Sequence, residues 1–221
     1  MQIEFIDIES IDTCSLFFLG FGMTPHALSP IDKALSRTAD AIVYFSSYHQ
    51  IQHFRIPKAK HYRLLAWSFG VSIAIEFCQQ FSKIIRSITF CNGTPTPINR
   101  LYGIHPAIVQ KMHRQFSHVR YQDFLSLCVT PEKVAWNDPL PNRSISDCKE
   151  ELAFFLERKN RCVLESWPTH QPNPRIWVGI HDRVLLANAQ KRAWSHYGFA
   201  TQRIPTGHMP KTYFTQWMQN R

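Results

Sequence analysis

The sequence has 221 residues and a formal net charge of +9. Its 44% hydrophobic and 19% charged residues are typical of a globular protein, which excludes a disordered or fibrous chain. The positive charge favours acidic partners, but no zinc-finger, helix-turn-helix or RNA-binding pattern is present, so nucleic acid is not an expected partner.

The N-terminal residues carry acids where an export signal would carry basic residues, and no apolar run reaches the roughly 18 residues of a membrane helix. We therefore expect a cytoplasmic protein with no membrane partner. Six scattered cysteines form no CxxC pair, so reduced, buried thiols are expected and neither a metal site nor a disulfide framework. They are Cys14, Cys78, Cys91, Cys128, Cys148 and Cys162.

Short apolar runs that end at turn residues predict the strands. Between them, apolar residues at helical spacing predict a helix after Gly70 and another over 187–196. Strands that are continuous apolar runs and alternate with helices indicate a mainly parallel sheet covered on both faces, which is an α/β fold. The expected strands are 15–19, 40–45, 62–66, 87–91, 175–180 and 198–204.

The stretch 95–173 contains no clear strand but two helix-like segments, 108–124 and 146–165, the second with Ser146 as a plausible N-cap. Long insertions are commonly functional, so we interpret it as a helical lid inserted into an α/β core of residues 1–94 and 174–221. Extra packing without a lid function is the alternative.

Ser68 lies in the segment Ala66-Trp67-Ser68-Phe69-Gly70, between a predicted strand and a predicted helix. A strand–serine–helix turn raises the hydroxyl above the sheet and requires small residues two positions before and after it. Alanine replaces the usual first glycine, so the pentapeptide is a relaxed form that chance could also supply. The flanking elements favour a nucleophile over a turn serine.

Asp182 and His208 complete the order Ser–Asp–His, and each directly follows a predicted strand. The carboxyl ends of parallel strands meet at one edge of a sheet, so both should lie near Ser68. His208 would be the general base and Asp182 its orienting acid. His181, Asp138 and Asp147 remain alternatives for the third position.

An acyl-transfer serine also needs backbone donors for the oxyanion. The N–H of Phe69, next to the nucleophile, is one candidate. The turn Gly20-Phe21-Gly22 follows the first predicted strand, and we expect the N–H of Phe21 to be the second donor. Taken alone, that turn would be an ordinary strand end.

These segments together resemble the BioG family of pimeloyl-[acyl-carrier protein] methyl ester esterases. The resemblance runs nearly end to end, although Phe21 stands where family members carry tryptophan. It is carried by Gly20-Phe21-Gly22, Arg63-Leu64-Leu65-Ala66-Trp67-Ser68, Asn92-Gly93-Thr94, Tyr102-Gly103-Ile104, Asp182-Arg183, Ala187-Asn188 and Gly207-His208.

The resemblance implies hydrolysis, without a cofactor or metal, of the methyl ester on a pimeloyl chain carried by acyl carrier protein. Such carriers are acidic, so a basic surface on the lid would favour their capture. We assign Lys111, Arg114 and Arg120 to this docking surface, with a solvated helix face as the alternative. The expected pocket residues are Trp67, Phe116 and Asn92.

Other functions remain open at this stage. A general short-chain carboxylesterase or an acyl-carrier-protein thioesterase would use the same three residues. A catalytically silent binding protein on the same fold is the non-enzymatic alternative. An enzyme acting at a lipid surface ranks last, because the sequence has no obvious amphipathic anchor helix.

Overall fold

A computed structural model of the chain describes residues 2–25, 41–51, 53–129, 143–159, 164 and 166–219. In these ranges six parallel strands form one sheet in the order β2-β1-β3-β4-β5-β6, which confirms the expected parallel α/β architecture. The strands are β1 Gln2–Phe18, β2 Ala41–Phe45, β3 His53–Trp67, β4 Ile85–Cys91, β5 Arg175–Gly179 and β6 Gln202–Ile204.

Two central strands are much longer than the sequence predicts. β1 and β3 pair from Gln2 and His53 onward, with a register shift between Ile6 and Ile11. In the first half of β3 exposed and buried residues largely alternate. This half therefore contains no continuous apolar run from which a buried strand could be predicted. The last strand is shorter than expected and begins only at Gln202.

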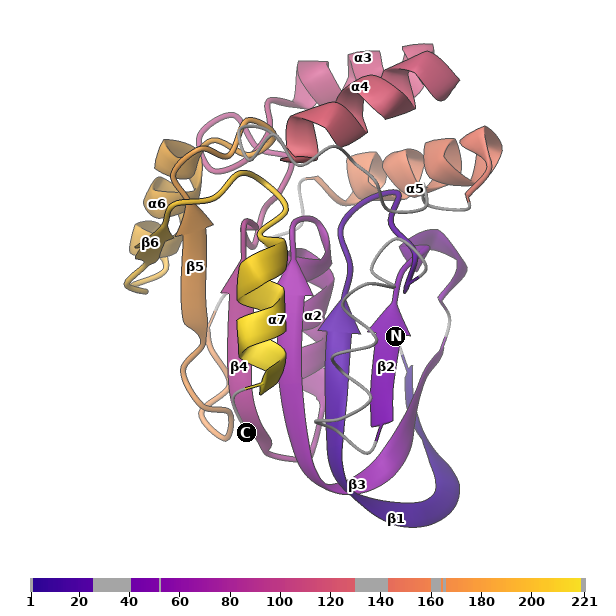
Figure 1. The fold of residues 1–221 in the computed structure, drawn as a ribbon, viewed down its shortest axis with the longest axis vertical. Coiled ribbons are helices and arrows are strands. Elements are labelled where there is room, and N and C mark those ends of the chain that lie inside the picture. The colour runs from indigo at the N-terminus through magenta and orange to yellow at the C-terminus, as the bar shows by residue number, and fades with distance from the viewer. Residues whose placement is uncertain are drawn as a thin grey trace.

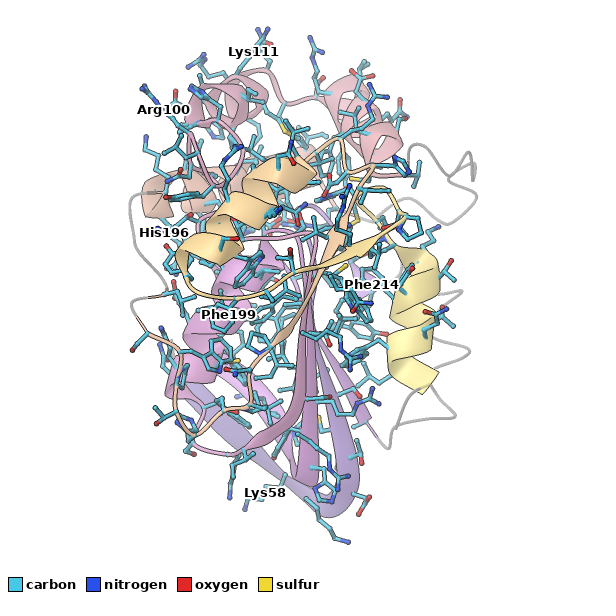
Figure 2. The ribbon with its side chains drawn as sticks, turned by 90° about the vertical axis from the view of Figure 1, so that its left-hand side faces the viewer. Lys58, Arg100, Lys111, His196, Phe199 and Phe214 are labelled. Carbon is cyan, nitrogen blue, oxygen red and sulfur yellow. The ribbon has the colours of Figure 1, made fainter. Side chains whose placement is uncertain are left out.

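Helices cover both faces of the sheet (Figure 1). On one face lie α2 (Gly70–Gln80), where Phe77 packs on Phe18 with ring centroids 5.3 Å apart, and α6 (Ala187–His196). The other face is covered by α7 (Lys211–Gln219), whose Phe214 lies between this helix and the sheet (Figure 2). α7 is not predicted from the sequence, whereas α6 has the expected bounds.

Three helices, here named the cap helices, lie beyond the carboxyl ends of the strands (Figure 1). They are α3 (Pro106–Gln115), α4 (His118–Val129) and α5 (Ile145–Arg158). The single helix expected over 108–124 is wrong, because Ser117 Oγ accepts the N–H of Arg120 and starts a new helix. The N-cap of α5 is Ser144 and not Ser146, since Ser144 Oγ accepts the N–H of Asp147 at 3.1 Å.

The cysteines that the structure describes are free and buried, as expected; Cys162 lies outside the described residues. Burial raises the pKa of the Cys14 and Cys148 thiols to about 12, so they are protonated at neutral pH. In the described ranges, none of the helices has the length and apolarity that spanning a membrane requires.

Candidate active site

Ser68 stands in a sharp turn between β3 and α2. Its φ of +56° is left-handed, a strained conformation for a residue with a side chain, and its N–H donates to Cys91 O at 3.0 Å. Gly70 makes this turn possible, because a Cβ there would lie 2.4 Å from Leu19 O. The local sequence therefore holds the hydroxyl above the carboxyl edge of the sheet.

The structure brings the three predicted side chains into one hydrogen-bonded series. His208 Nε2 lies 2.9 Å from Ser68 Oγ, and His208 Nδ1 lies 2.8 Å from Asp182 Oδ2. The alternatives are not part of it, because the side chain of His181 is exposed and Asp147 belongs to α5, where it pairs with Arg143. Asp138 lies outside the described residues.

Asp182 is held in place by its own set of donors. The N–H groups of Val184 and Leu185 donate to Oδ1 at 2.9 and 2.8 Å, and Gln190 Nε2 donates to Oδ2 at 2.9 Å. A carboxylate so oriented accepts from His208 Nδ1–H and leaves Nε2 free to accept the proton of the serine. Gln190, from α6, is a contact of the candidate site that the sequence did not reveal.

Two further side chains hold the loop that carries His208. Asn92 Nδ2 donates to the carbonyls of Gly207 and His208, both at 2.8 Å, while its Oδ1 accepts the N–H of Gly179. Trp67 Nε1 donates to His208 O at 2.7 Å. Asn92 and Trp67 were expected in the pocket wall; both are almost completely buried and act on the backbone around His208.

Phe21 and Phe69 supply the two N–H groups expected to stabilise an oxyanion. Among the described residues neither N–H has a hydrogen-bond acceptor. Their rings lie near each other, with centroids 6.4 Å apart, and Tyr48 supports the preceding strand end by donating its OH to Leu19 O at 2.7 Å. Donors that are held in place but unused are what a developing negative charge requires.

The remaining predicted residues lie in or beside the cap helices. Phe116, between α3 and α4, contacts the ring of Phe21 with centroids 5.7 Å apart, which places it next to the candidate oxyanion loop. Lys111, Arg114 and Arg120 are exposed, and Arg120 lies 3.6 Å from the acidic side chain of Asp123.

The site is closed from solvent in this structure. Ser68 is only 4% exposed and His208 is fully buried. A dry environment strengthens the hydrogen bonds of the Ser68–His208–Asp182 series, and it also means that a substrate reaches Ser68 only after side chains around it move.

Comparison with known proteins identifies a family whose sequences match this chain. Residues 1–220 match the family model described as pimeloyl-ACP methyl esterase BioG. An uncharacterized protein of Haemophilus influenzae is 25% identical over 221 residues, covering 98% of this chain and 97% of that protein. A malonyl-[acyl-carrier protein] O-methyltransferase of Bacteroides fragilis is 25% identical over 202 residues, and this chain spans only 39% of its length.

Solved structures agree on the fold. The crystal structure of BioG from Haemophilus influenzae is similar with a TM-score of 0.74 and 24% identity, covering 93% of each chain. An esterase from Exiguobacterium antarcticum has a TM-score of 0.68 and 14% identity, covering 96% of this chain and 91% of its own. With the family match over nearly the whole sequence, these findings show that the chain belongs to the BioG family of pimeloyl-ACP methyl esterases and is an ester hydrolase with the α/β-hydrolase fold.

Proposed function

We propose that the protein hydrolyses the methyl ester of a pimeloyl group carried by acyl carrier protein, with Ser68, His208 and Asp182 as its catalytic triad. The observation that carries this proposal is the continuous contact from Ser68 Oγ through His208 to Asp182, at 2.9 and 2.8 Å. A serine is a weak nucleophile until a positioned base removes its proton, and this contact provides that base.

In the first half of the reaction Ser68 Oγ attacks the ester carbonyl carbon while His208 Nε2 takes the hydroxyl proton. The carbonyl oxygen becomes an oxyanion, which the N–H groups of Phe21 and Phe69 stabilise. The tetrahedral intermediate collapses, and the C–O bond to the methoxy group breaks. His208 returns the proton to the methoxy oxygen, methanol leaves, and an acyl-enzyme ester remains on Ser68.

The second half repeats these steps with water. His208 Nε2 takes a proton from water as its oxygen attacks the acyl carbon, and the new oxyanion occupies the same donors. Ser68 Oγ then leaves with the proton from His208. The product is a free carboxylate at the far end of the chain, still joined to its carrier by the thioester. Throughout, Asp182 stabilises the positive charge that His208 acquires twice.

The family match supports a methyl ester as the bond that is cleaved. The partial similarity to the Bacteroides fragilis protein points the same way, because an O-methyltransferase acting on malonyl-[acyl-carrier protein] forms a methyl ester on a carrier-bound acid. The segment that resembles this chain makes up 39% of that longer protein. That protein therefore combines a segment similar to this chain with the activity that its name describes, methyl transfer to malonyl-[acyl-carrier protein]. A hydrolase that removes the methyl group is the chemical complement of that activity.

Product analysis with methyl pimeloyl-[acyl-carrier protein] tests the proposal. We expect methanol and an intact acyl-carrier conjugate, because the nucleophile attacks the oxygen ester at the far end of the chain. Release of the carrier's free thiol would instead identify a thioesterase. Equal rates for unrelated short-chain esters would identify a general carboxylesterase. A folded protein that binds the conjugate without turnover would identify the binding protein.

The outer surface of α3 and α4 suits an acidic carrier, and we assign the carrier docking role to it. Figure 2 shows Lys111 pointing outward at the end of the molecule formed by the cap helices. Large apolar side chains are exposed there beside the basic ones: Ile108 is 61% exposed and Val119 66%. Charge that attracts an acidic partner, combined with apolar groups that it can cover, favours capture. The cap helices would then act as the lid.

Charge reversal tests this surface. We expect Lys111→Glu combined with Arg114→Glu to raise KM for the carrier-bound ester about tenfold or more, because attraction becomes repulsion, while kcat/KM for a small soluble ester stays unchanged. The matched control is Lys83→Glu with Arg86→Glu at the opposite end of the sheet, which makes the same change in net charge. Equal KM values for both double variants would remove the docking role.

A further inference from the structure

The Gly20–Gly22 loop is held from above by two cap helices. The N–H of Gly22 donates to Glu151 Oε2 in α5 at 3.0 Å, and the carbonyl of Gly22 accepts the hydroxyl of Tyr121 from α4. Both peptide groups of one residue are therefore engaged by side chains more than 90 positions away. Gly22 has a φ of +72°, and a Cβ there would lie 3.0 Å from the Tyr121 ring, so any other residue would be strained at this position.

Glu151 is a fully buried carboxylate with a complete set of partners. Its Oε1 accepts the N–H of Tyr48 at 3.3 Å, and its Oε2 also accepts from the guanidinium of Arg143, itself almost fully buried. Burial acts to lower the pKa of Arg143, but the carboxylates of Glu151 and Asp147 outweigh it and the pKa is raised. A buried ion pair often contributes no more to stability than apolar packing would, so the Glu151–Arg143 pair invites an explanation other than stability.

The position of the Glu151 carboxylate supplies that explanation. It contacts the residue that directly follows Phe21, whose N–H is the proposed second oxyanion donor. The direction of that N–H depends on the backbone of the loop, and Gly22 is fixed by Glu151 on one side and Tyr121 on the other. The ring of Phe21 also packs on Phe124 of α4, with centroids 5.5 Å apart.

We propose that Glu151 and Tyr121 are positioning residues that hold the Gly20–Gly22 loop so that the Phe21 N–H points at the oxyanion, which makes the oxyanion hole dependent on seated cap helices. This inference rests on the proposed function. The Ser68–His208–Asp182 series is held mainly by Asn92 and Trp67 at strand ends and by Gln190 of α6, although the N–H of Met209, next to His208, donates to Cys128 O of α4 at 2.9 Å. Seating of the cap helices thus governs the direction of the Phe21 N–H, whereas Ser68 itself is held by the turn between β3 and α2.

Tyr121→Phe is the primary test, because it removes one hydroxyl and keeps the ring. We expect kcat for p-nitrophenyl butyrate to fall roughly tenfold with KM nearly unchanged, less than the loss of a whole oxyanion donor. Inhibition by a trifluoromethyl ketone, which forms a tetrahedral oxyanion on the serine, should weaken by the same factor. Rates are divided by the active sites titrated with a fluorophosphonate, so that unfolded protein does not contribute.

The matched control is Tyr62→Phe. Tyr62 is likewise buried and donates its hydroxyl to a backbone carbonyl, that of Pro57 at 3.0 Å, but in β3 and far from the Gly20–Gly22 loop. We expect it to lower thermal stability without changing kcat or ketone inhibition. If Tyr121→Phe proves too unstable, the same kinetic measurements are made on Glu151→Gln. This variant keeps the shape of the side chain but loses one of the two oxygens that accept the N–H groups of Gly22 and Tyr48.

The possible results distinguish failure of the positioning role of Tyr121 and Glu151 from failure of the proposed function. Wild-type kcat in Tyr121→Phe, or a fall in kcat without weaker ketone inhibition, would overturn the positioning role. An equal fall in Tyr62→Phe would show a general loss of stability and would overturn it as well. Failure of the proposed function gives different results: either Ser68→Ala is as active as the wild type on p-nitrophenyl butyrate, or the wild type fails to release methanol from methyl pimeloyl-[acyl-carrier protein].

Discussion

Replacing Ser68 with alanine is expected to lower kcat by about 10⁴-fold or more, because the substitution removes the attacking atom and leaves only the binding site and the oxyanion donors. The measurement is methanol release from methyl pimeloyl-[acyl-carrier protein], with labelling by a fluorophosphonate probe as a second readout. Labelling should disappear along with turnover, since both require the same hydroxyl 2.9 Å from His208 Nε2.

Two companion variants complete this prediction. His208→Ala should cost about as much as Ser68→Ala, and the double variant little more, because the members of a triad act as a unit. Ser15→Ala is the control: Ser15 is also buried but belongs to β1, away from His208. If Ser68→Ala kept substantial turnover while Ser15→Ala lost it, the nucleophile would have been assigned to the wrong serine.

Asp182→Asn is the second large effect, with an expected loss in kcat of about 10³- to 10⁴-fold and little change in KM. The amide can present an N–H group to His208 Nδ1 where the carboxylate presents an oxygen, and this favours the tautomer that carries its proton on Nε2. Nε2 then points a hydrogen at Ser68 and cannot accept one. The backbone donors of Val184 and Leu185 hold Oδ1, so the side chain has little freedom to escape this conflict.

Asp123→Asn is the control for this substitution, because Asp123 is an exposed residue of α4 that pairs with Arg120 on the protein surface. Its kinetics should match the wild type. NMR of the His208 ring nitrogens gives a direct readout of the tautomer. Wild-type kcat in Asp182→Asn would mean that His208 is oriented without this carboxylate and that the third member lies elsewhere.

The three candidate catalytic residues could be predicted because each leaves a local mark in the sequence. Ser68, Asp182 and His208 all come shortly after strands that the sequence predicts, and in a parallel sheet the carboxyl ends of the strands meet at one edge. Their positions after the strands are therefore enough to predict that the three residues lie near one another, even when the order of the strands in the sheet is unknown. The contact distances confirm the placement, while the catalytic roles stay predictions.

The side chains that support these residues could not be predicted in the same way. Asn92 was recognised as a polar residue at a strand end, but its partners, Gly179 and His208, depend on which strands are neighbours. Glu151 did leave a signal: it lies at helical spacing among Cys148, Leu152 and Phe155, all buried. An acid on the apolar face of a helix predicts a buried ion pair, but not the loop that it contacts.

The contacts that hold the reactive groups lie mainly at the ends of the strands, whereas the outer residues of the cap helices face away from them. This has a consequence for evolution. Asn92 fastens His208 to the ends of β4 and β5, so the nucleophile and its base depend on the most deeply packed layer. Among the described residues, the outer side chains of α3 and α4 make no hydrogen bond to His208, although the main-chain carbonyl of Cys128 in α4 accepts the N–H of the next residue, Met209, at 2.9 Å. Natural selection can therefore change the outer cap residues, and with them the partner that is accepted, while the chemistry at Ser68 is inherited intact. The same division would let a designer graft a different cap onto this sheet, provided that a carboxylate and a hydroxyl still meet Gly22.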